Sequence, residues 1–560
     1  MKRLQSALIT LIPLLVGGTA AAQCPLDRWL ASDGMEGDHF GSDVALDGDL
    51  ALVGAGSDKL GTVHSAGSAY VFRRQGDLWV EEQKLVPPTP LQNNQFGLAV
   101  AIDGDVAVCG VPNDEAQGFW VGSVEVFRFD GTTWQPEQQL VSATPFIGAR
   151  FGWAVDVEGD RVVVGARSED SVLNSSGAAY VFSYDGSSWV QDQRLVPPDP
   201  ALIGEYGHAV ATSGDVLVVG AWRDDDFGIF TGAAYVYRQI GGSWILEQKL
   251  VPLDAGEFYR FGASVGIDGD TIVCGAYEAR VGNIAAGAAY VYERLSGIWT
   301  EQAKLVASDT DAADSFGWSV DIAGDLVAVG SRRDATPLID SGSIYLYRRN
   351  GGVWSELVKF PSTAGSGGQL GQSISASGER VLAGGWIENS PTGLEAGAAH
   401  LFSASEGCSA GVPFCDCTGG APCGNGGGAL AGCANSTGGG ASLEAQGSAS
   451  VGAGDLVLLA GGLPPGTALF FQGETDLNGG LGSPLGDGLL CAGGTILRLG
   501  VVPQGGGNLS FPNPGDPSIA TTGGVQAGDA RVYQLWYRDV SGPCSSGFNL
   551  TNAVAVDWGA

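Results

Sequence analysis

The chain has 560 residues and a formal net charge of −33 at pH 7, with 28 lysines and arginines against 61 aspartates and glutamates. A polyanion of this kind repels nucleic acids and anionic lipid surfaces, so we expect neither as a partner. Glycine is abundant at 91 residues, which suits a chain rich in turns, and the length allows more than one domain.

Residues 1–22 have the pattern of a secretory signal peptide. Lys2 and Arg3 precede an apolar run from Ala7 to Val16, and an Ala-x-Ala cleavage site follows at residues 20–22. No later segment offers about 18 consecutive apolar residues, so we expect no insertion into a membrane. The mature chain is therefore predicted to be secreted or associated with the cell surface.

A repeat dominates residues 23–407. An aromatic–glycine or leucine–glycine pair returns every 54 to 56 residues, and a steady period of this length is typical of an array of supersecondary units. The seven pairs begin at Phe40, Phe96, Phe151, Tyr206, Phe261, Phe316 and Leu370.

Each repeat predicts four short strands, as the first one shows. Ser42–Leu46 alternates small apolar and polar residues and ends at an Asp-Gly pair, for which we expect a type I′ turn. Leu50–Gly54 is a continuous apolar run, and Gly67–Phe72 and Trp79–Leu85 supply the third and fourth strands. Four strands per period predict an all-β fold, a seven-bladed β-propeller.

The two ends of the array predict how the ring closes. The seventh repeat has a third strand, Gly397–Phe402, but no fourth strand follows it. Leu26–Ser32 resembles a fourth strand and stands before the first repeat, so we expect this N-terminal strand to complete the last blade. Closure would leave no long unpaired edge.

The spacing of Phe-Gly to Gly-Ala, followed by Gly-x-Ala-Tyr-Val-Phe, resembles the FG-GAP repeat family, here of a secreted bacterial type. Its best-known members are the propeller heads of integrin α subunits, which implies ligand recognition on the face with variable loops. Calcium-binding members carry an Asp-x-Asp-x-Asp-Gly loop, whereas this chain has only short turns such as Asp47-Gly48-Asp49. Because calcium needs six to eight oxygens, we expect no metal site and no cofactor.

The loops after the second and fourth strands are long and variable, so we expect function on that face. Two residues after the glycine that ends each second strand, large side chains recur that could ring the mouth of the central channel and bind a ligand. The alternative is that they pack between loops. Asp224–Asp226 on the same face could hold a cation, or it could be a solvated charge run. The candidate ligand-binding residues are Arg167, Trp222, Tyr277, Arg332 and Trp386.

The cysteines divide into two kinds. Cys109 and Cys274 stand in positions that other repeats fill with valine, so we expect buried free thiols. Cys24 and Cys408 would meet at the hairpin mouth that closes the ring, and we expect a disulfide between them. The pairing of six further cysteines stays open: Cys415, Cys417, Cys423, Cys433, Cys491 and Cys544.

The composition changes after residue 407. Residues 408–440 are rich in glycine and cysteine and predict a disulfide-stapled linker. In residues 441–560 short apolar runs return between Gly/Pro turns, which predicts a small disulfide-rich β-sandwich-like domain. The expected strands are Asp455–Ala460, Ala468–Gln472, Thr495–Val502, Arg531–Val540 and Ala553–Trp558.

Catalytic motifs are scarce: the sequence has no His-Glu-x-x-His, no Gly-x-Ser-x-Gly and no P-loop. We therefore expect a monomeric, non-enzymatic recognition or adhesion protein with no catalytic residues, which binds an extracellular protein or polysaccharide. Two alternatives remain. One is an extracellular carbohydrate-active enzyme, a lyase or hydrolase, on a propeller scaffold; the other is a structural cell-envelope protein.

Overall fold

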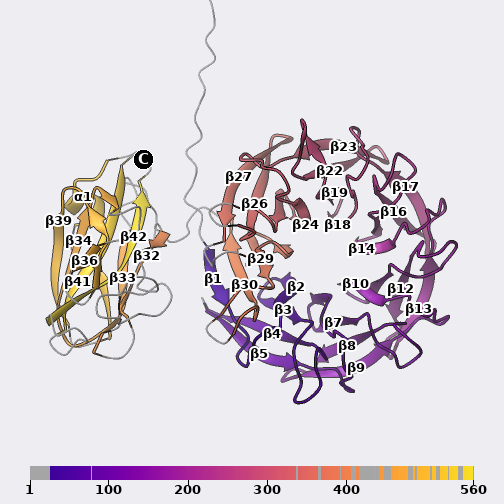
Figure 1. Cartoon of the computed structure of the whole chain (residues 1–560), viewed down its shortest axis with the longest axis horizontal. Helices are drawn as coiled ribbons and strands as arrows, with labels where there is room; N and C mark the ends of the chain where they lie inside the picture. The colour runs from indigo at the N-terminus through magenta and orange to yellow at the C-terminus, as the bar shows by residue number, and fades with distance from the viewer. Residues whose placement is uncertain are drawn as a thin grey trace, which may run out of the picture. The chain divides into compact units, whose positions relative to one another are not determined.

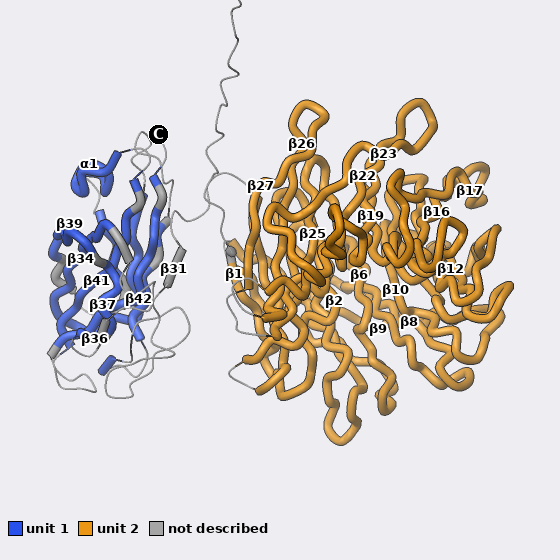
Figure 2. The backbone as a smooth tube through the Cα atoms, turned by 45° about the horizontal axis from the view of Figure 1, so that its top comes forward, with its two compact units in different colours: residues 1–24, 406–560 blue, residues 25–405 orange. Residues whose placement is uncertain are grey.

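The computed structural model describes residues 25–404, apart from 77, 336–338, 363–366 and 391–392. In the C-terminal region it describes 412–414, 433, 435–436, 440–446, 456–476, 483–485, 488–504, 507–512, 517–526, 529–539 and 547–558. The predicted signal peptide and both cysteines of the predicted clasp, Cys24 and Cys408, lie outside these residues. The chain divides into two compact units, Pro25–Ser405 and one that includes Glu406–Ala560 (Figure 2).

The unit Pro25–Ser405 is built of four-stranded antiparallel sheets arranged around a centre, as the repeat predicts for a β-propeller (Figure 1). Its described residues form seven such sheets, called blades 1 to 7 here. The first strands are β2 (Phe40–Asp47), β6 (Val100–Asp103), β10 (Phe151–Glu158), β14 (Tyr206–Ser213), β18 (Ser264–Asp268), β24 (Phe316–Ala323) and β28 (Ser373–Ser377). The second strands are β3 (Leu50–Ala55), β7 (Val106–Val111), β11 (Arg161–Ala166), β15 (Val216–Ala221), β19 (Thr271–Ala276), β25 (Leu326–Ser331) and β29 (Arg380–Gly385).

The two outer positions of each blade follow the same order. The third strands are β4 (Ser68–Gln75), β8 (Ser123–Phe129), β12 (Ala178–Tyr184), β16 (Ala233–Ile240), β22 (Ala288–Leu295), β26 (Ser343–Asn350) and β30 (Ala398–Ser403). The fourth strands are β5 (Leu78–Leu85), β9 (Trp134–Leu140), β13 (Trp189–Leu195), β17 (Ser243–Leu250), β23 (Ile298–Leu305), β27 (Val353–Pro361) and, in blade 7, β1 (Pro25–Trp29). A small hairpin, β20 (Arg280–Val281) with β21 (Ile284–Ala285), lies in a loop of blade 5.

Blade 7 is completed by the N-terminal strand. β1 pairs antiparallel with β30, with Arg28 opposite His400 and Trp29 opposite Ala399. Blade 7 also joins blade 1 through a parallel bridge between Gly397 and Phe40, the same bridge that links the other neighbouring blades. Two segments from opposite ends of the propeller unit thus form one sheet, as expected.

The turns between first and second strands differ from the type I′ prediction. Gly48 has φ +54°, but the following residue, Asp49, is not among the described residues with positive φ. A type I′ turn needs positive φ at both central positions, whereas a type II′ turn needs it only at the first. The prediction of a type I′ turn is therefore wrong, and the glycine alone carries the unusual conformation.

Close contact between blades explains why two glycines recur. A Cβ added to Gly220, the glycine near the end of β15, would lie 2.1 Å from the carbonyl oxygen of Gly262 in the next blade. The equivalent contact recurs around the ring and includes Gly384 of blade 7 against the carbonyl of Gly41 in blade 1, at 2.0 Å. Only a residue without a side chain permits backbones to approach this closely.

The substitution Gly220→Ala should destabilise the propeller by about 1–3 kcal/mol, because the added methyl group overlaps a backbone carbonyl that cannot rotate away. The measurement is the urea dependence of tryptophan fluorescence. Gly368→Ala is the matched control, since its added Cβ would meet nothing closer than 3.7 Å. Equal midpoints for the two variants would contradict the packing argument.

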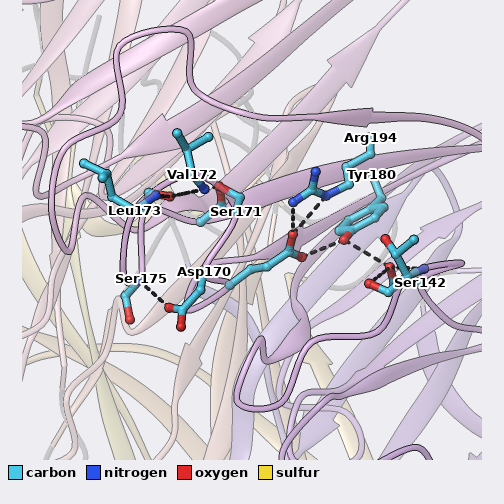
Figure 3. A network of polar contacts seen from close by, with 12 residues as sticks. Ser142, Asp170, Ser171, Val172, Leu173, Ser175, Tyr180 and Arg194 are labelled. Carbon is cyan, nitrogen blue, oxygen red and sulfur yellow. Dashed lines mark hydrogen bonds and ion pairs between the residues drawn. The ribbon is translucent and has the colours of Figure 1, made fainter.

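Each blade contains a buried polar cluster, which we call the niche, built on one cross-strand pair of the third and fourth strands. In blade 3 the side chain of Arg194 pairs with Glu169, a carboxylate that is 1% exposed, and Tyr180 Oη donates to Glu169 Oε2 at 2.6 Å (Figure 3). A buried carboxylate needs such partners, because an unpaired buried charge is very costly. The seven pairs are Tyr70–Lys84, Glu125–Gln139, Tyr180–Arg194, Tyr235–Lys249, Tyr290–Lys304, Tyr345–Lys359 and His400–Arg28.

The described part of the second unit contains two main sheets. One has the order β31 (Val412–Phe414), β42 (Gly547–Asp557), β41 (Ala530–Asp539), β34 (Gly466–Gly473) and β39 (Leu497–Gln504). The other has the order β32 (Ser442–Gln446), β33 (Val457–Leu463) and β40 (Gly507–Phe511). The remaining elements are β35 (Thr475–Asp476), β36 (Ser483–Leu485), β37 (Gly488–Leu490), β38 (Ala492–Gly493) and α1 (Ile519–Gly523).

Side chains from both of these sheets share one apolar cluster, which includes Leu458 of β33 and Phe470 of β34. The predicted linker 408–440 is not wholly a linker, because β31 lies within it and pairs with β42. Cys433 and Cys491 are buried in one apolar cluster and neither is a free thiol; the other four cysteines whose pairing was left open lie outside the described residues. In the propeller, Cys109 and Cys274 are free and buried, as expected.

No helix in the described part of the chain has the length and apolar character needed to cross a membrane.

Candidate functional site

A cavity of about 570 Å³ lies at the centre of the propeller. The first strands of all seven blades contribute to its wall, mostly with small and aliphatic side chains. Aromatic and arginine side chains stand at one end of the blades, where each first strand begins and each second strand ends. These residues come from blades 3 to 6, so they occupy one side of the channel mouth.

The large side chains at the mouth touch one another in sequence. The indole of Trp222 stacks on the imidazole of His208, with centroids 4.7 Å apart, and lies 6.0 Å from the ring of Tyr277. Tyr277 in turn lies 4.8 Å from the ring of Trp318. We call the continuous set the aromatic–arginine arc: Trp153, Arg167, His208, Trp222, Tyr277, Trp318 and Arg332.

An arginine closes each end of the arc. The guanidinium of Arg167 lies 3.2 Å from the ring centroid of Trp153, and that of Arg332 lies 3.2 Å from the ring centroid of Trp318. Stacking on an aromatic face fixes the plane of a guanidinium group while leaving its edge free to donate hydrogen bonds. The arc therefore presents oriented donors beside flat apolar faces.

One carboxylate anchors the centre of the arc. Glu205 accepts hydrogen bonds from Trp222 Nε1 at 3.0 Å and Arg223 Nη1 at 2.7 Å, and it forms an ion pair with Arg167 at 3.3 Å. Burial alone would raise the pKa of Glu205, but His208, whose Nδ1 lies 3.8 Å from Glu205 Oε2, and the charge of Arg167 outweigh it and hold the pKa at about 2. Glu205 thus stays ionised and fixes Trp222 in place.

The arginines around the arc outnumber their acidic partners. Arg223 and Arg260 also lie against the Trp222 ring, at 4.5 and 5.0 Å from its centroid. Several guanidinium nitrogens at the arc are buried and donate no hydrogen bond to any described residue. They are Nε of Arg167, Arg223, Arg260 and Arg332, and Nη1 of Arg260.

Burial lowers the pKa of both terminal arginines, Arg167 and Arg332, to about 10. Holding buried cations with unused donors costs free energy, which an anionic ligand would offset. The channel mouth is therefore locally cationic although the net charge of the whole chain is −33.

The five predicted ligand-binding residues do not all belong to this site. Arg167, Trp222 and Tyr277 line the central cavity, and Arg332 stacks on Trp318, which also lines it. Trp386 does not line the cavity; its ring packs against His39, and its Nε1 donates to Gln369 Oε1 at 3.0 Å. Trp386 is therefore placed outside the arc, where its side chain supports neighbouring loops.

Three of the seven residues of the arc were not predicted from the sequence. Trp153, His208 and Trp318 each directly follow a Phe-Gly or Tyr-Gly pair, a position that other repeats fill with small, aliphatic or amide residues. The prediction compared repeats at only one position, the one after the second strand. Because each first strand pairs with its second strand in antiparallel register, the two positions lie side by side, and comparing both would have found the arc.

Deeper in the channel, three aspartates connect blades. Asp43 accepts a hydrogen bond from the backbone N–H of Val100 at 2.8 Å, and Asp156 and Asp321 accept equivalent bonds from the next blade at 2.7 Å. Burial raises the pKa of Asp43 and Asp156 to about 7 and that of Asp321 to about 6. None of these three aspartates belongs to the group of described residues whose side chains could together hold a metal ion.

The raised pKa values predict that acidification stabilises the propeller. The folded chain binds protons at these aspartates at a higher pH than the unfolded chain does, where the pKa is about 3.9, so the unfolding free energy should increase as pH falls from 8 to 5. We expect the apparent Tm to rise by several degrees over that range. Paired acids such as Glu205, with a pKa of about 2, titrate mostly below this window. Burial lowers the pKa of His39 and His208, so these two groups oppose the trend and reduce its size.

The control is the double variant Asp156→Asn/Asp321→Asn, which removes both titrations and keeps one acceptor oxygen at each position for the N–H of the next blade. The second oxygen of each aspartate, which accepts from the N–H of the following residue, is lost. The Tm of this double variant should depend less on pH, although Asp38 and Glu125, whose pKa values burial also raises, will still contribute. A wild-type Tm that is constant or increases with pH from 5 to 8 would contradict the argument.

The acidic run Asp224–Asp226 is not a solvated charge run throughout. Asp224 is buried, and together with Asp199 and Asp226 it forms the one group of described residues whose carboxylates could surround a cation. Lys249 Nζ already lies 2.6 to 2.9 Å from all three carboxylates. The chain therefore supplies its own cation, and this is the niche of blade 4.

Comparison with known families agrees with the repeat. A family model described as FG-GAP repeat matches residues 27–72, 79–127, 134–182, 189–237, 244–292 and 299–347, more than half of the chain. Each matched stretch begins in the fourth strand of one blade, or in β1, and ends in the third strand of the next. No curated protein matches the chain.

Proposed function

The chain belongs to the FG-GAP repeat family, and from this premise we propose that it is a secreted, non-enzymatic recognition protein that binds an acidic extracellular polysaccharide. The binding site is the aromatic–arginine arc at the mouth of a seven-bladed ring. A disulfide between Cys24 and Cys408 clasps that ring, and the protein acts as a monomer.

The observation that carries this proposal is the set of buried guanidinium donors that donate no hydrogen bond to any described residue, beside stacked aromatic rings. Carboxylate or sulfate groups of an acidic sugar match the planar donor edge of arginine, and the flat faces of sugar rings match indole and phenol rings. The cavity volume of about 570 Å³ lies within the range of roughly 300–1,000 Å³ that is usual for small-ligand sites.

The enzymatic alternative, a lyase or hydrolase, is favoured by one feature: His208 and Tyr277 stand next to arginines in the arc. Burial raises the pKa of Tyr277 to about 12, so its hydroxyl stays protonated at neutral pH. A protonated phenol supports hydrogen bonding to a ligand better than proton abstraction from one. We therefore place recognition first.

The test is a binding screen of the chain without residues 1–22 on acidic and neutral polysaccharides and on extracellular proteins. We expect binding to acidic polysaccharides that weakens as NaCl is raised and is unaffected by chelator. Binding only to neutral glycans or only to proteins would contradict the proposed ligand class. Release of shortened sugars would establish the enzyme instead, and self-association without any ligand would favour a structural envelope role.

A further inference from the structure

The niche of blade 2 differs from those of the other six blades. In the other six, the fourth-strand member of the pair is a lysine or arginine: Lys84, Arg194, Lys249, Lys304, Lys359 or, from β1, Arg28. In blade 2 this member is Gln139, which is neutral, and its third-strand partner is Glu125 in place of an aromatic residue. The exchange removes a positive charge and adds a carboxylate at the same place.

The two carboxylates of this niche are buried without a cation. Asp114 and Glu125 are each 6% exposed, and no ion pair of either residue with a described lysine, arginine or histidine is present. Gln139 Nε2 donates to Glu125 Oε1 at 2.8 Å and to Asp114 Oδ2 at 3.2 Å. An amide replaces the hydrogen bonds of the missing ammonium, but it cannot replace the charge.

Glu125 also keeps one oxygen unused. Its Oε1 accepts the bond from Gln139, whereas Oε2 accepts no hydrogen bond from any described residue. Burial, and then the charge of Asp114, raises the pKa of Glu125 to about 7. This Oε2 is not among the fully buried side-chain oxygens that have no hydrogen-bond partner, so it can be reached from the cavity that Glu125 lines.

The niche opens into a cavity that the other observations do not explain. The cavity measures about 350 Å³, and both Asp114 and Glu125 line it. Its remaining wall is mixed. Apolar residues such as Pro87, Leu91 and Pro136 line it together with polar ones, which are Thr89, Asn94, Glu137, Gln138 and Gln139. Two carboxylates beside apolar side chains match an ammonium group on an alkyl chain. Asp114 and Glu125 do not belong to the group of described residues whose ligand atoms converge closely enough to hold a metal ion.

The repeated architecture shows what fits there. In blade 4, Lys249 Nζ lies 2.9 Å from Asp224 Oδ2, and Asp224 holds the same place in its repeat as Asp114 does in blade 2. We propose that the blade 2 cavity binds the primary ammonium end of an alkylamine, supplied from outside the chain, in the place that an internal lysine takes in other blades. The amine can be a free small molecule or the side chain of a partner's lysine, which share this chemistry.

The experiment titrates the full chain with n-butylammonium and with n-butanol, its neutral analogue, by ligand-observed NMR and calorimetry. We expect saturable binding of butylammonium and none of butanol. Nα-acetyl-lysine amide and 1,5-diaminopentane then distinguish a lysine side chain from a free amine. Equal signals for butylammonium and butanol, or binding of calcium without binding of butylammonium, would overturn the proposal.

Two variants test the position. Glu125→Gln keeps the shape but removes one charge and should weaken butylammonium at least about tenfold. The double variant Glu125→Tyr/Gln139→Lys rebuilds the tyrosine–lysine pair of blade 4, so it should raise Tm and abolish binding. Retention of binding by the folded double variant would show that the ammonium binds elsewhere.

A positive control comes from blade 4. Lys249→Ala empties a niche that normally holds its own ammonium, so the Tm of this variant should fall and butylammonium should partly restore it. If butylammonium raised the Tm of neither Lys249→Ala nor the wild-type chain, the idea that these niches accept external amines would be overturned.

Discussion

Replacing Arg194 with methionine should lower the free energy of unfolding by about 3–5 kcal/mol, because it leaves the buried carboxylate of Glu169 without its cation. Methionine keeps much of the side-chain volume and its contact with the apolar surroundings, so the loss reports mainly on charge. Tyr180 Oη would still donate to Glu169 at 2.6 Å, but one neutral hydrogen bond does not offset the desolvation of a carboxylate. The measurement is urea denaturation at pH 7.5, followed by tryptophan fluorescence.

The loss in Arg194→Met should shrink as the pH is lowered. Burial already raises the pKa of Glu169 in the wild-type chain, and removal of Arg194 raises it further. The variant therefore takes up a proton on Glu169 at a higher pH than wild type, and its stability relative to wild type increases as pH falls from 8 toward 5. A deficit that is constant across this range would contradict the assignment of the loss to an uncompensated carboxylate.

Two control variants separate charge from packing. Glu169→Gln/Arg194→Met removes both charges and should cost clearly less than Arg194→Met alone. Arg194→Lys restores the cation that blades 1, 4, 5 and 6 use in the same position and should recover most of the stability. If Arg194→Met lost less than about 1 kcal/mol of unfolding free energy, the pair of Arg194 and Glu169 would contribute no more than an ordinary surface ion pair.

The architecture of the propeller could be predicted from the sequence because the contacts that shape one blade recur in every repeat. The contact between Gly220 and the carbonyl of Gly262 recurs in every blade, so the same glycine spacing returns seven times and marks the strand order. The role of β1 could also be predicted, because the last repeat visibly lacks a strand that Leu26–Ser32 resembles. Sequence patterns within one repeat were enough to predict the blades, because each blade contacts only its neighbours.

The candidate site could be predicted only in part. Position within the repeat placed Arg167, Trp222 and Tyr277 at the cavity, but it also suggested Trp386, whose neighbours differ because it stands next to the closure of the ring. The charge balance of the arc depends on contacts between residues of different repeats. Glu205, for example, joins Arg167 of blade 3 to Trp222 of blade 4, and no spacing in the sequence shows this.

The C-terminal unit shows a second limit. Its strands were largely expected, but their order was not, since β34 pairs with both β39 and β41, which are distant in sequence. The short helix α1 was missed because five residues are too few to show a helical period. Its boundaries become clear only from the Ser518 side chain that caps it and from Gly524, at φ +62°, that ends it.

Trp222→Ala should reduce the affinity for an acidic polysaccharide by about 30-fold or more, the size typical of an aromatic hot spot. Trp222 stands at the centre of the arc, where it stacks on His208 and lies beneath Arg223 and Arg260. Its removal therefore eliminates one stacking surface and releases two guanidinium groups from their fixed orientation. The measurement is the Kd at two NaCl concentrations, by titration calorimetry.

Trp386→Ala is the matched control for that variant. Trp386 is the same residue type at the equivalent position of blade 7, it is also partly buried, and its Nε1 also donates to a side chain. Because it does not line the cavity, its substitution should change Kd by less than about threefold, the range of residues outside a hot spot. Equal losses in the two variants would mean that the site lies elsewhere on the loop face, and a loss only in Trp386→Ala would move it to the closing blade. A loss confined to Trp222→Ala, together with weaker binding at high salt, identifies the arc as the place where stacked rings and oriented arginines act together on an anionic ligand.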